Sequence, residues 1–367
     1  MRSALLEAGQ KPLKIVDDVE ALEPGPGQVL VRVHYCGICH SDLTIIDSAN
    51  STPLPVVLGH EAAGVVEAVG AGVRSVSPGD HVVSVAMAPC GRCYFCVRGE
   101  QTICIEARTF MTGLFPDGSA ALRRTGETVY RGLGVGGFSQ YSLTTEAGVV
   151  KIDADVPLDL ATVVGCAVQT GVGAVLNAAK VEVGATVLVM GLGGIGISVV
   201  QGARIAGASK IIGSDPLAAR REAALHFGAT DVIDPAQTDV IGACYTATNG
   251  IGVDYAFDAA GHHKLVEAGL FATRYGGTTV MVGAPAADQN LTLSPAVLAV
   301  VAEKKIMGTL YGTGNPARTI PMLMSLWRRG ALDLESMVSF RRPLDEINDG
   351  LDDVRAGRGI RTIVDLR

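Results

Sequence analysis

Aromatic and charged residues are both scarce in this sequence. Only 5% of its 367 residues are aromatic, with a single Trp, and 18% are charged, whereas 48% are hydrophobic. A chain of this composition can bury enough apolar surface to offset the entropy cost of ordering its backbone, which excludes intrinsic disorder. The 46 glycines follow no G-X-Y repeat, so a collagen-like fibre is also excluded.

An excess of positive charge is missing as well. The chain has 30 Lys and Arg against 37 Asp and Glu, which gives a net charge of −7, and its basic residues are scattered. A surface that binds nucleic acid or lipid needs a basic patch. We therefore expect a small-molecule substrate or a second copy of the chain as partner, with no nucleic acid and no membrane.

No apolar signal segment follows Met1, so a cytoplasmic protein is expected. Two uncharged stretches, residues 160–179 and 183–200, are long enough to cross a membrane, but glycines interrupt both, and we interpret them as buried elements. Eight cysteines, several of them two residues apart, favour metal binding over a disulfide framework.

Two domains are predicted from the length and from a change of pattern along the chain. Short β-branched runs separated by turns dominate the first part, and apolar strands alternate with alanine-rich helices from residue 168 onward, which indicates a doubly wound parallel sheet. The final strand, 360–364, is expected to return to the first domain. The predicted domains are therefore 1–167 with 309–367, and 168–308. The polar, glycine-rich segment 108–137 is interpreted as a surface excursion.

A glycine-rich loop predicts a dinucleotide site in the second domain. Residues 191–196 read G-x-G-x-x-G, follow an apolar strand and open a helix, and Asp215 ends the next strand. Gly191 permits the tight turn, Gly193 lets the backbone approach a pyrophosphate, and Gly196 allows close helix–strand packing. Asp215 would accept hydrogen bonds from the ribose hydroxyls and repel a 2′-phosphate, which favours NAD over NADP.

Four cysteines in one short loop predict a structural zinc site. Cys90, Cys93, Cys96 and Cys104 are spaced so that their sulfurs can reach one tetrahedral ion, and four thiolates leave no open position. Separately, Cys39, His60 and Cys166 together offer the Cys₂His set of a catalytic zinc with its fourth position open.

These motifs, taken in order, resemble those of zinc-dependent medium-chain alcohol dehydrogenases from end to end. The resemblance rests on 37–42 (GICHSD), 59–64 (GHEAAG), the four-cysteine loop, the glycine loop, and 360–363 (IRTI). Residues 126–130 and 137–141 resemble the branch that includes the liver-type and glutathione-dependent (class III) enzymes. The resemblance implies a β-rich, GroES-like catalytic domain beside a Rossmann domain.

The resemblance also implies roles around a catalytic zinc. Cys39, His60 and Cys166 would hold the ion, with Glu61 as an occasional alternative ligand, and Asp42 would orient a ligand from behind. Ser41 would accept the alcohol proton. The zinc would act as a Lewis acid on the alcohol oxygen while hydride passes to NAD.

Further positions are implied along the cofactor and the substrate. Cofactor contacts are expected at Gly191, Gly193, Gly194, Ile195, Gly196, Asp215, Arg220, Thr170, Val282, Ala284, Arg361 and His40. Substrate-pocket positions are expected at Ala86, Gly132, Leu133 and Leu310. The resemblance further implies a homodimer with two zinc ions per chain.

Four positions that depart from the liver-type pattern affect this interpretation. His40 stands where those enzymes carry a pyrophosphate-binding arginine, and it is a candidate for the terminal base of the proton relay. Thr44 replaces the relay histidine and cannot titrate. Ala86 replaces a bulky aromatic beside the substrate, and Gly132 falls where a large side chain is common. The two small residues predict a wide pocket that accepts bulky or aromatic alcohols.

Three alternatives remain open from the sequence. A glutathione-dependent formaldehyde dehydrogenase is favoured by Arg108, at that subgroup's carboxylate-binding position, and opposed by Ser48 and Asn50, which replace expected acidic residues. A nicotinoprotein would hold its NAD permanently. A zinc- and nucleotide-binding protein without catalysis would bind only one zinc ion per chain.

Overall fold

The computed structural model describes residues 1–48, 52–286 and 288–367, and these divide into two compact units. The first unit consists of Met1–Cys166, Asn315–Ser325 and Leu334–Arg367, and the second of Ala167–Gly314 and Leu326–Asp333. The expected boundary at 167 lies beside the observed one. The expected boundary at 308 lies before Gly314, and the short return of 326–333 to the second unit has no counterpart in the sequence-based division.

The first unit is built on two antiparallel-rich sheets. One has the strand order β11-β7-β6-β4-β19-β18, with β10 also paired to β4, and the other has the order β2-β1-β5-β9-β8-β3. The strands of the first sheet are β4 (Gln28–Ile38), β6 (Glu61–Val69), β7 (His81–Ser84), β10 (Tyr141–Thr145), β11 (Val149–Lys151), β18 (Val338–Pro343) and β19 (Arg361–Asp365). Those of the second are β1 (Ser3–Leu6), β2 (Lys14–Val16), β3 (Val19–Ala21), β5 (Val56–Val57), β8 (Leu122–Arg124) and β9 (Glu127–Arg131).

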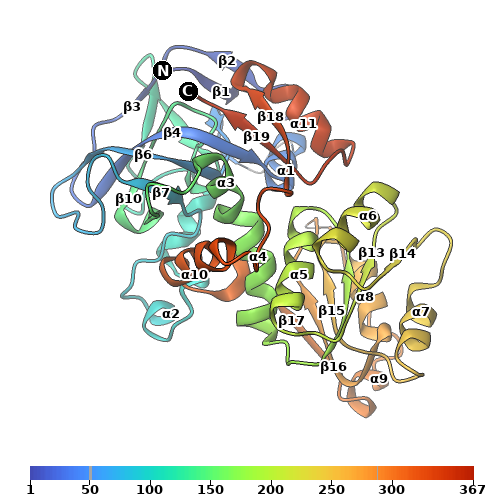
Figure 1. Ribbon diagram of the computed structural model, residues 1–367. Helices are drawn as coiled ribbons and strands as arrows, with labels where there is room; N and C mark the ends of the chain where they lie inside the picture. The colour runs from blue at the N-terminus through green and yellow to red at the C-terminus, as the bar shows by residue number, and fades with distance from the viewer. Residues whose placement is uncertain (49–51, 287) are drawn as a thin grey trace. The chain divides into compact units, whose positions relative to one another are not determined.

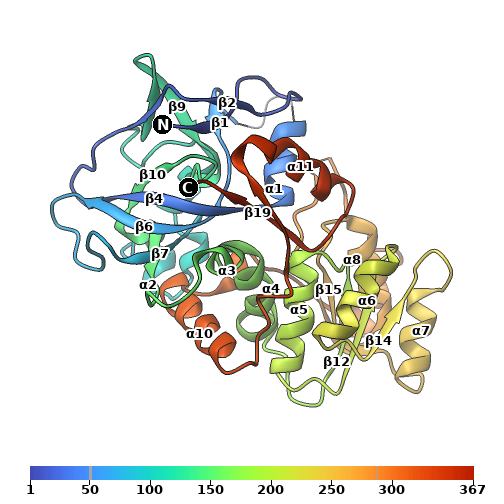
Figure 2. The same ribbon diagram turned by 45° about the horizontal axis from the view of Figure 1, so that its top comes forward.

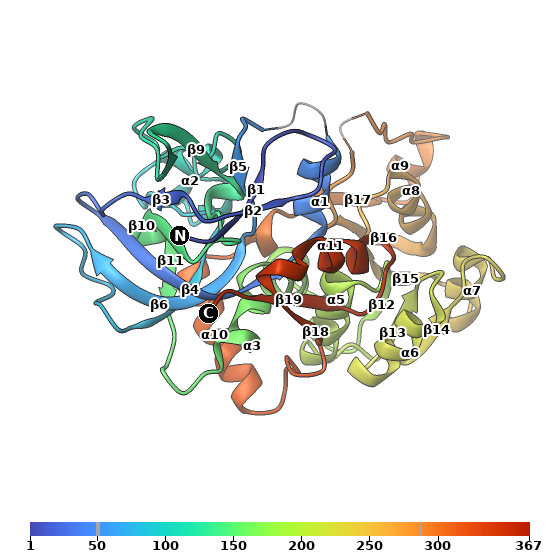
Figure 3. The same cartoon turned by 90° about the horizontal axis from the view of Figure 1, so that it is seen from above.

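Strand β4 is the centre of this unit and carries its functional end. Val29, Val31 and Val33 are at most 1% exposed and alternate with more exposed residues, as a period of two requires of a strand with one buried face. The last residues of β4 are buried throughout. The C-terminal strand β19 pairs antiparallel with this end, with Ile363 opposite Gly37 (Figures 2 and 3). The predicted return of the last strand to the first domain is therefore confirmed.

The segment 108–137 is not the surface excursion that the sequence suggested. It supplies β8 and β9 to the second sheet, where they pair with β3 and β5. Leu122 and Val129 are at most 1% exposed and join the main core cluster. The glycines and the turn at 116–118 gave this segment a polar appearance, but its short strands each place one apolar side chain inward.

The second unit contains a six-stranded parallel sheet with the order β14-β13-β12-β15-β16-β17. Numbered by chain order within the sheet, this is 3-2-1-4-5-6, the doubly wound order of dinucleotide-binding folds. Its strands are β12 (Thr186–Met190), β13 (Lys210–Ser214), β14 (Asp231–Ile233), β15 (Val253–Asp258), β16 (Thr273–Met281) and β17 (Lys305–Gly308). The prediction of a parallel sheet is confirmed.

Helices cover both faces of this sheet, and its central strand is therefore buried on both sides. Val187, Leu188 and Val189 are all fully buried, so β12 has no solvent face. Helices α5 and α6 pack together over β12–β14, whereas α7 and α8 pack together, with α8 over β15 and β16 (Figures 1 and 2). The helices of this unit are α4 (Gln169–Gly173), α5 (Gly194–Ile205), α6 (Ala218–Phe227), α7 (Val240–Ala247), α8 (His263–Ala272) and α9 (Val297–Val301).

The remaining helices are short or amphipathic elements that flank the sheets. They are α1 (His40–Asp47), α2 (Tyr94–Val97), α3 (Leu158–Val163), α10 (Pro316–Arg328) and α11 (Ile347–Arg355). Within the described residues, one helical run, Leu158–Ala179, is long and apolar enough to cross a membrane, but 94% of its most apolar window is buried inside the protein. Such burial is typical of a core helix.

Candidate metal centres and cofactor loop

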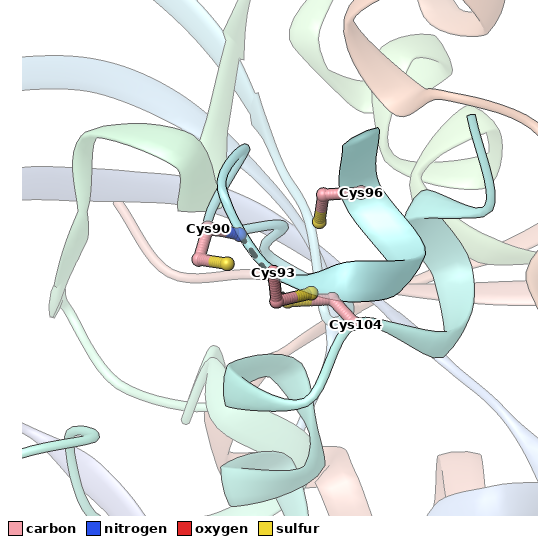
Figure 4. Close-up of side chains that lie close together, drawn as sticks. All are labelled: Cys90, Cys93, Cys96 and Cys104. Carbon is pink, nitrogen blue, oxygen red and sulfur yellow. Dashed lines mark hydrogen bonds between the residues drawn. The ribbon is translucent and has the colours of Figure 1, made fainter. Parts of the chain in front are cut away.

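The four cysteines of the loop 90–104 converge on one point. Their sulfurs all lie within 4.8 Å of one another (Figure 4). The sulfurs of Cys93 and Cys104 are 3.8 Å apart, which is the separation of about 3.8 Å that two thiolates at ~2.3 Å from a tetrahedral zinc would have. Cys90, Cys93 and Cys96 come from a turn and the start of α2, and Cys104 follows a 3₁₀ turn at Gln101–Ile103.

The electrostatics of the loop 90–104, which we call the cysteine lobe, also suit a cation. Backbone N–H groups of Ile105 and Cys96, together with the neighbouring thiols of Cys96 and Cys90, lower the pKa of the Cys93 thiol to about 6. Burial raises the pKa of Cys96 to about 12. A metal ion would hold all four as thiolates, and because all four ligands are protein sulfurs, no position would remain for substrate.

A second cluster is assembled from three distant segments of the first unit. Cys39 precedes α1, His60 and Glu61 lie at the start of β6, and Cys166 lies in a π-helical turn at Val164–Val168. The candidate ligand atoms of these four residues all lie within 4.8 Å of one another. All four are buried, with Cys166 the most exposed at 9%. The structure thus brings together the residues that the sequence offered as an open zinc site.

Asp42 fixes the geometry of this cluster from behind. It is fully buried, and its two carboxylate oxygens accept hydrogen bonds from the backbone N–H groups of Cys39 and Gly59, each at 3.0 Å. Its Oδ1 also lies 3.4 Å from Nδ1 of His60. One carboxylate therefore ties the β4–α1 turn to the β5–β6 connection and sets the orientation of the imidazole, as carboxylates behind metal-bound histidines do.

Glu61 and Arg361 form a buried ion pair beside the cluster. The guanidinium Nη2 lies 3.3 Å from Oε1 of Glu61, and Nη1 donates to the carbonyl oxygen of Ile38 at 3.0 Å. Burial raises the pKa of Glu61 to about 8, although Arg361 opposes this shift. Sequence reasoning missed Gly37, where a Cβ would lie 2.3 Å from Oε2 of Glu61. A glycine two residues before Cys39, at the end of the strand pattern, was the available signal.

The donor set fits a zinc ion with one position left open. Cys166 donates a hydrogen bond to Cys39 and thereby lowers the pKa of the Cys39 thiol well below its usual range, against the opposing effect of burial. Buried thiolates and carboxylates are costly unless a cation compensates them. Two sulfurs and one imidazole would hold such an ion, and three protein ligands are the number found in catalytic zinc sites.

The three polar residues expected in the proton path lie on α1. His40 is exposed as the first residue of the helix, and Ser41 is half-buried with its Oγ 3.7 Å from the sulfur of Cys39. Thr44 donates its hydroxyl proton to the carbonyl oxygen of His40 at 3.1 Å. Ser41 is therefore near the cluster, and the Thr44 hydroxyl is engaged by the helix backbone. Asn50, which entered the comparison with glutathione-dependent enzymes, lies outside the described residues.

The glycine loop of the second unit joins β12 to α5. Gly191 has φ +86°, a conformation that favours glycine, and a Cβ on Gly196 would lie 1.8 Å from the carbonyl oxygen of Gly191. At Gly193, which caps α5, a Cβ would meet only Arg220, at 3.9 Å. The loop thus has no room for a side chain at Gly196, where it packs on itself, but has open space at Gly193. Gly194 and Ile195 form the first turn of the helix.

Asp215 directly follows β13, lies beside this loop and is 2% exposed. Its Oδ2 accepts a hydrogen bond from the N–H of Leu192 at 2.8 Å, and its Oδ1 accepts one from Leu217 at 2.9 Å. Arg220 lies 3.7 Å from Oδ2. The carboxylate therefore also holds the glycine loop against the neighbouring strand, a second role that the sequence did not predict.

The other positions expected along the cofactor lie in the second unit. Thr170 in α4 and Val282 after β16 are buried, whereas Ala284 is exposed. Their contacts with a nicotinamide remain predictions. The same holds for Arg361, whose guanidinium contacts Glu61 and Ile38 in the first unit.

The expected substrate positions differ from one another in their surroundings. Ala86 lines a cavity of about 610 Å³ within the first unit. Gly132 is buried, and a Cβ there would lie 2.5 Å from Cδ2 of Leu58, so this glycine serves close packing and does not widen a pocket. Leu133, at φ +50°, packs against the core cluster, and Leu310, in the second unit, is 46% exposed.

The first unit thus carries two candidate metal sites, and the second unit carries a sheet with the strand order of dinucleotide-binding folds. Family models agree: the alcohol dehydrogenase GroES-like domain matches residues 25–154, and the zinc-binding dehydrogenase model matches residues 194–328. The chain belongs to the zinc-dependent medium-chain alcohol dehydrogenases, so it is an oxidoreductase that uses zinc and a nicotinamide dinucleotide.

Three relatives illustrate the similarity. An S-(hydroxymethyl)glutathione dehydrogenase of Escherichia coli O1:K1 / APEC is 38% identical over 99% of both chains. The structure of a zinc-binding alcohol dehydrogenase domain protein from Burkholderia ambifaria is 35% identical, with a TM-score of 0.95, over 100% of this chain and 98% of that one. Benzyl alcohol dehydrogenase from Acinetobacter calcoaceticus is 32% identical, with a TM-score of 0.94, over 100% and 99%.

Proposed function

We propose that the cluster of Cys39, His60 and Cys166 holds the catalytic zinc of an alcohol dehydrogenase, with Glu61 as an alternative ligand. The cysteine lobe would hold a second, structural zinc, which makes two per chain. The observation that carries this proposal is the convergence of four buried ligand atoms, from three separate segments, within 4.8 Å. A protein that needed zinc only for stability would have no use for a second cluster with a position left open.

When bound, zinc supplies a Lewis acid for the alcohol oxygen, and NAD supplies the hydride acceptor. The protein's own residues orient the zinc ligands and carry the alcohol proton away. Asp42 holds the His60 ring and the Cys39 backbone in place, so the ligands stay in one arrangement. Ser41, beside Cys39, would accept the alcohol proton through its hydroxyl. Thr44 has no pKa in the working range, so the proton would leave the relay through His40 or to water.

The nucleotide would lie on the loop 191–196, with its pyrophosphate at the N-terminus of α5. Gly193 leaves space for this approach, because a Cβ there would meet no atom nearer than 3.9 Å. Asp215 would select NAD over NADP. Each of its oxygens accepts one backbone hydrogen bond, and a carboxylate oxygen has a further lone pair for a ribose hydroxyl. Arg220 would flank the ribose.

The substrate is proposed to be a bulky or aromatic alcohol, oxidised reversibly to its aldehyde or ketone. Ala86 supports this, because a small side chain lines a large cavity at that point, and benzyl alcohol dehydrogenase is among the close structural relatives. The second candidate is oxidation of S-(hydroxymethyl)glutathione, which the 38% identical relative favours. We further propose a cytoplasmic homodimer.

A substrate panel tests the proposal. NADH formation should be measured with benzyl alcohol, ethanol and S-(hydroxymethyl)glutathione, and benzyl alcohol should give the largest kcat/KM of the three. A larger value with S-(hydroxymethyl)glutathione would replace the proposed substrate with the second candidate. NAD that stays bound through gel filtration, with no turnover unless an external acceptor is added, would instead identify a nicotinoprotein.

Cofactor choice is tested by the substitution Asp215→Ala. The wild type should prefer NAD over NADP, and the variant should narrow that preference by about 10- to 10³-fold, since burying one carboxylate against a phosphate costs several kcal/mol. Arg221→Gln is the matched control. Arg221 lies close to Asp215, but its guanidinium donates to the backbone carbonyl oxygen of Asp215 and not to its carboxylate. A wild-type preference for NADP would overturn the role of Asp215.

A further inference from the structure

A buried cation, Arg131, lines the cavity of about 610 Å³ in the first unit, and the lining of this cavity also includes Cys90 of the cysteine loop. Arg131, the last residue of β9, is 4% exposed. Its Nη1 donates to the carbonyl oxygens of Gly134 and Leu143 at 3.1 and 2.9 Å, and its guanidinium carbon stacks 4.0 Å above the ring centroid of Phe115. Its Nε is buried and has no hydrogen-bond partner among the described residues.

Arg131 also lacks an anionic partner within the described part of the chain. Burial alone lowers its pKa to about 10, with no carboxylate acting in the opposite direction. A guanidinium stays protonated even at that value near neutral pH. An arginine that is buried without a counter-ion is costly to the fold, so its retention beside a cavity of about 610 Å³ indicates a use.

The other charged residues that line this cavity are already satisfied. Glu106 pairs with Arg92 at 2.7 Å, and Lys151 pairs with Asp80 at 2.6 Å. Glu146 accepts hydrogen bonds from the backbone N–H groups of Arg74 and Ser75, at 2.7 and 2.6 Å. Arg131 is thus the charged residue of this lining whose charge has no described partner. The walls near it are apolar and include Phe110, Leu114 and Phe115.

We propose that this cavity is a binding site for an apolar carboxylate, with Arg131 holding the carboxylate and Phe110, Leu114 and Phe115 contacting the hydrocarbon. A guanidinium offers planar N–H donors that match a carboxylate, and an aromatic ring already stacked on it restricts its orientation. Ala86 lines the same cavity, which connects it to the position where the sequence placed the substrate.

Two kinds of ligand would present the same carboxylate to Arg131. It is either the far end of the alcohol substrate, a reading that rests on the proposed function, or a separate acid that binds without reacting. Binding itself does not depend on zinc or on NAD. Failure of the carboxylate site and failure of the dehydrogenase assignment are therefore distinguishable.

Calorimetry with the purified holoenzyme tests binding. Benzoate should bind the wild type, and the neutral analogue benzamide should bind at least about 10-fold more weakly, since a hydrogen-bonded charge pair contributes that much. Arg131→Gln should weaken benzoate binding by about 10- to 100-fold, and Arg131→Lys, which keeps the charge, should retain part of it. Lys151→Gln is the matched control, because it removes a lining charge that is already paired, and it should change benzoate affinity less than about 2-fold.

Kinetics then separates the two sources. If the substrate carries the carboxylate, the ratio of kcat/KM for 4-(hydroxymethyl)benzoate to that for benzyl alcohol should fall by at least about 10-fold in Arg131→Gln, and benzoate should compete with the alcohol. If a separate acid binds, the ratio should stay constant and benzoate should bind without competing.

Three results would overturn the proposal. The first is no benzoate binding to the wild type, and the second is equal binding of benzoate and benzamide. The third is an equal loss of benzoate affinity in Lys151→Gln. Should Arg131→Gln fail to fold, the wild-type comparison of benzoate with benzamide and the Arg131→Lys variant still decide the question.

Discussion

The two candidate metal sites of the first unit are built in opposite ways. The cysteine lobe takes four sulfurs from residues 90–104, with Cys90 and Cys93 half-exposed, so its geometry is set by local turns. The second cluster takes its donors from a strand end, a second strand and a helix far along the chain, and all of them are buried. A closed site can be written into one loop, whereas an open site needs a fold that holds its ligands in place and leaves one position unfilled.

The surroundings of the clusters differ in the same sense. In the cysteine lobe, backbone N–H groups of the same loop lower the pKa of the Cys93 thiol. The buried cluster relies on Asp42, Arg361 and Gly37, which reach it from three elements. Damage to the lobe should therefore act on stability, and damage to the buried cluster on activity. The predictions below test this contrast.

The largest effect is expected for Cys39→Ser. Loss of one thiolate should release the catalytic zinc and lower kcat/KM by at least about 10³-fold, because a Lewis-acid metal contributes several kcal/mol to the transition state. Elemental analysis should find one zinc ion per chain instead of two. Circular dichroism should show an unchanged fold. An active Cys39→Ser enzyme would remove the buried cluster from the mechanism.

The next effect is expected for Cys93→Ser in the lobe. This variant should also lose one zinc ion, but its free energy of unfolding should fall by about 4 kcal/mol, since the metal stabilises the folded loop. The corresponding fall in Tm is on the order of 10 °C and can be followed by scanning calorimetry. The fraction that stays folded should keep its kcat. A variant with normal Tm and no activity would reverse the assignment of the two clusters.

A smaller effect is expected for Asp42→Asn. One carboxylate accepts hydrogen bonds from Cys39 and Gly59, and an amide at this position would turn its NH₂ group toward one of those donors. Zinc affinity at the buried cluster should fall by about 10- to 100-fold, as for other residues that orient metal ligands. Competition with a chelator measures this affinity. Zinc retention in the lobe is the internal control, and an equal loss from both sites would contradict the role of Asp42.

Local features of the molecule were predictable from the sequence. The spacing of Cys90, Cys93, Cys96 and Cys104 limits how far their sulfurs can separate. The loop 191–196 carries its own conformational requirements in its glycines. The alternation of strands and helices gave the parallel sheet in the same way, since each element is defined by neighbours in the chain.

Features that depend on contacts between distant segments were missed or misjudged. Gly132 looked like an opening in a pocket wall, but Leu58, far away in sequence, packs against its Cα. The strands at 122–131 were hidden because each is short and pairs with a segment more than seventy residues earlier. The uncompensated charge of Arg131 is likewise visible only once the strand is placed in the core.

Zinc anomalous diffraction from the crystallised holoenzyme tests the central claim most directly. The account predicts two peaks per chain, one surrounded by the four lobe sulfurs and one bound by Cys39, His60 and Cys166. A single peak in the lobe, or a second peak that does not contact Cys39 and Cys166, would contradict it.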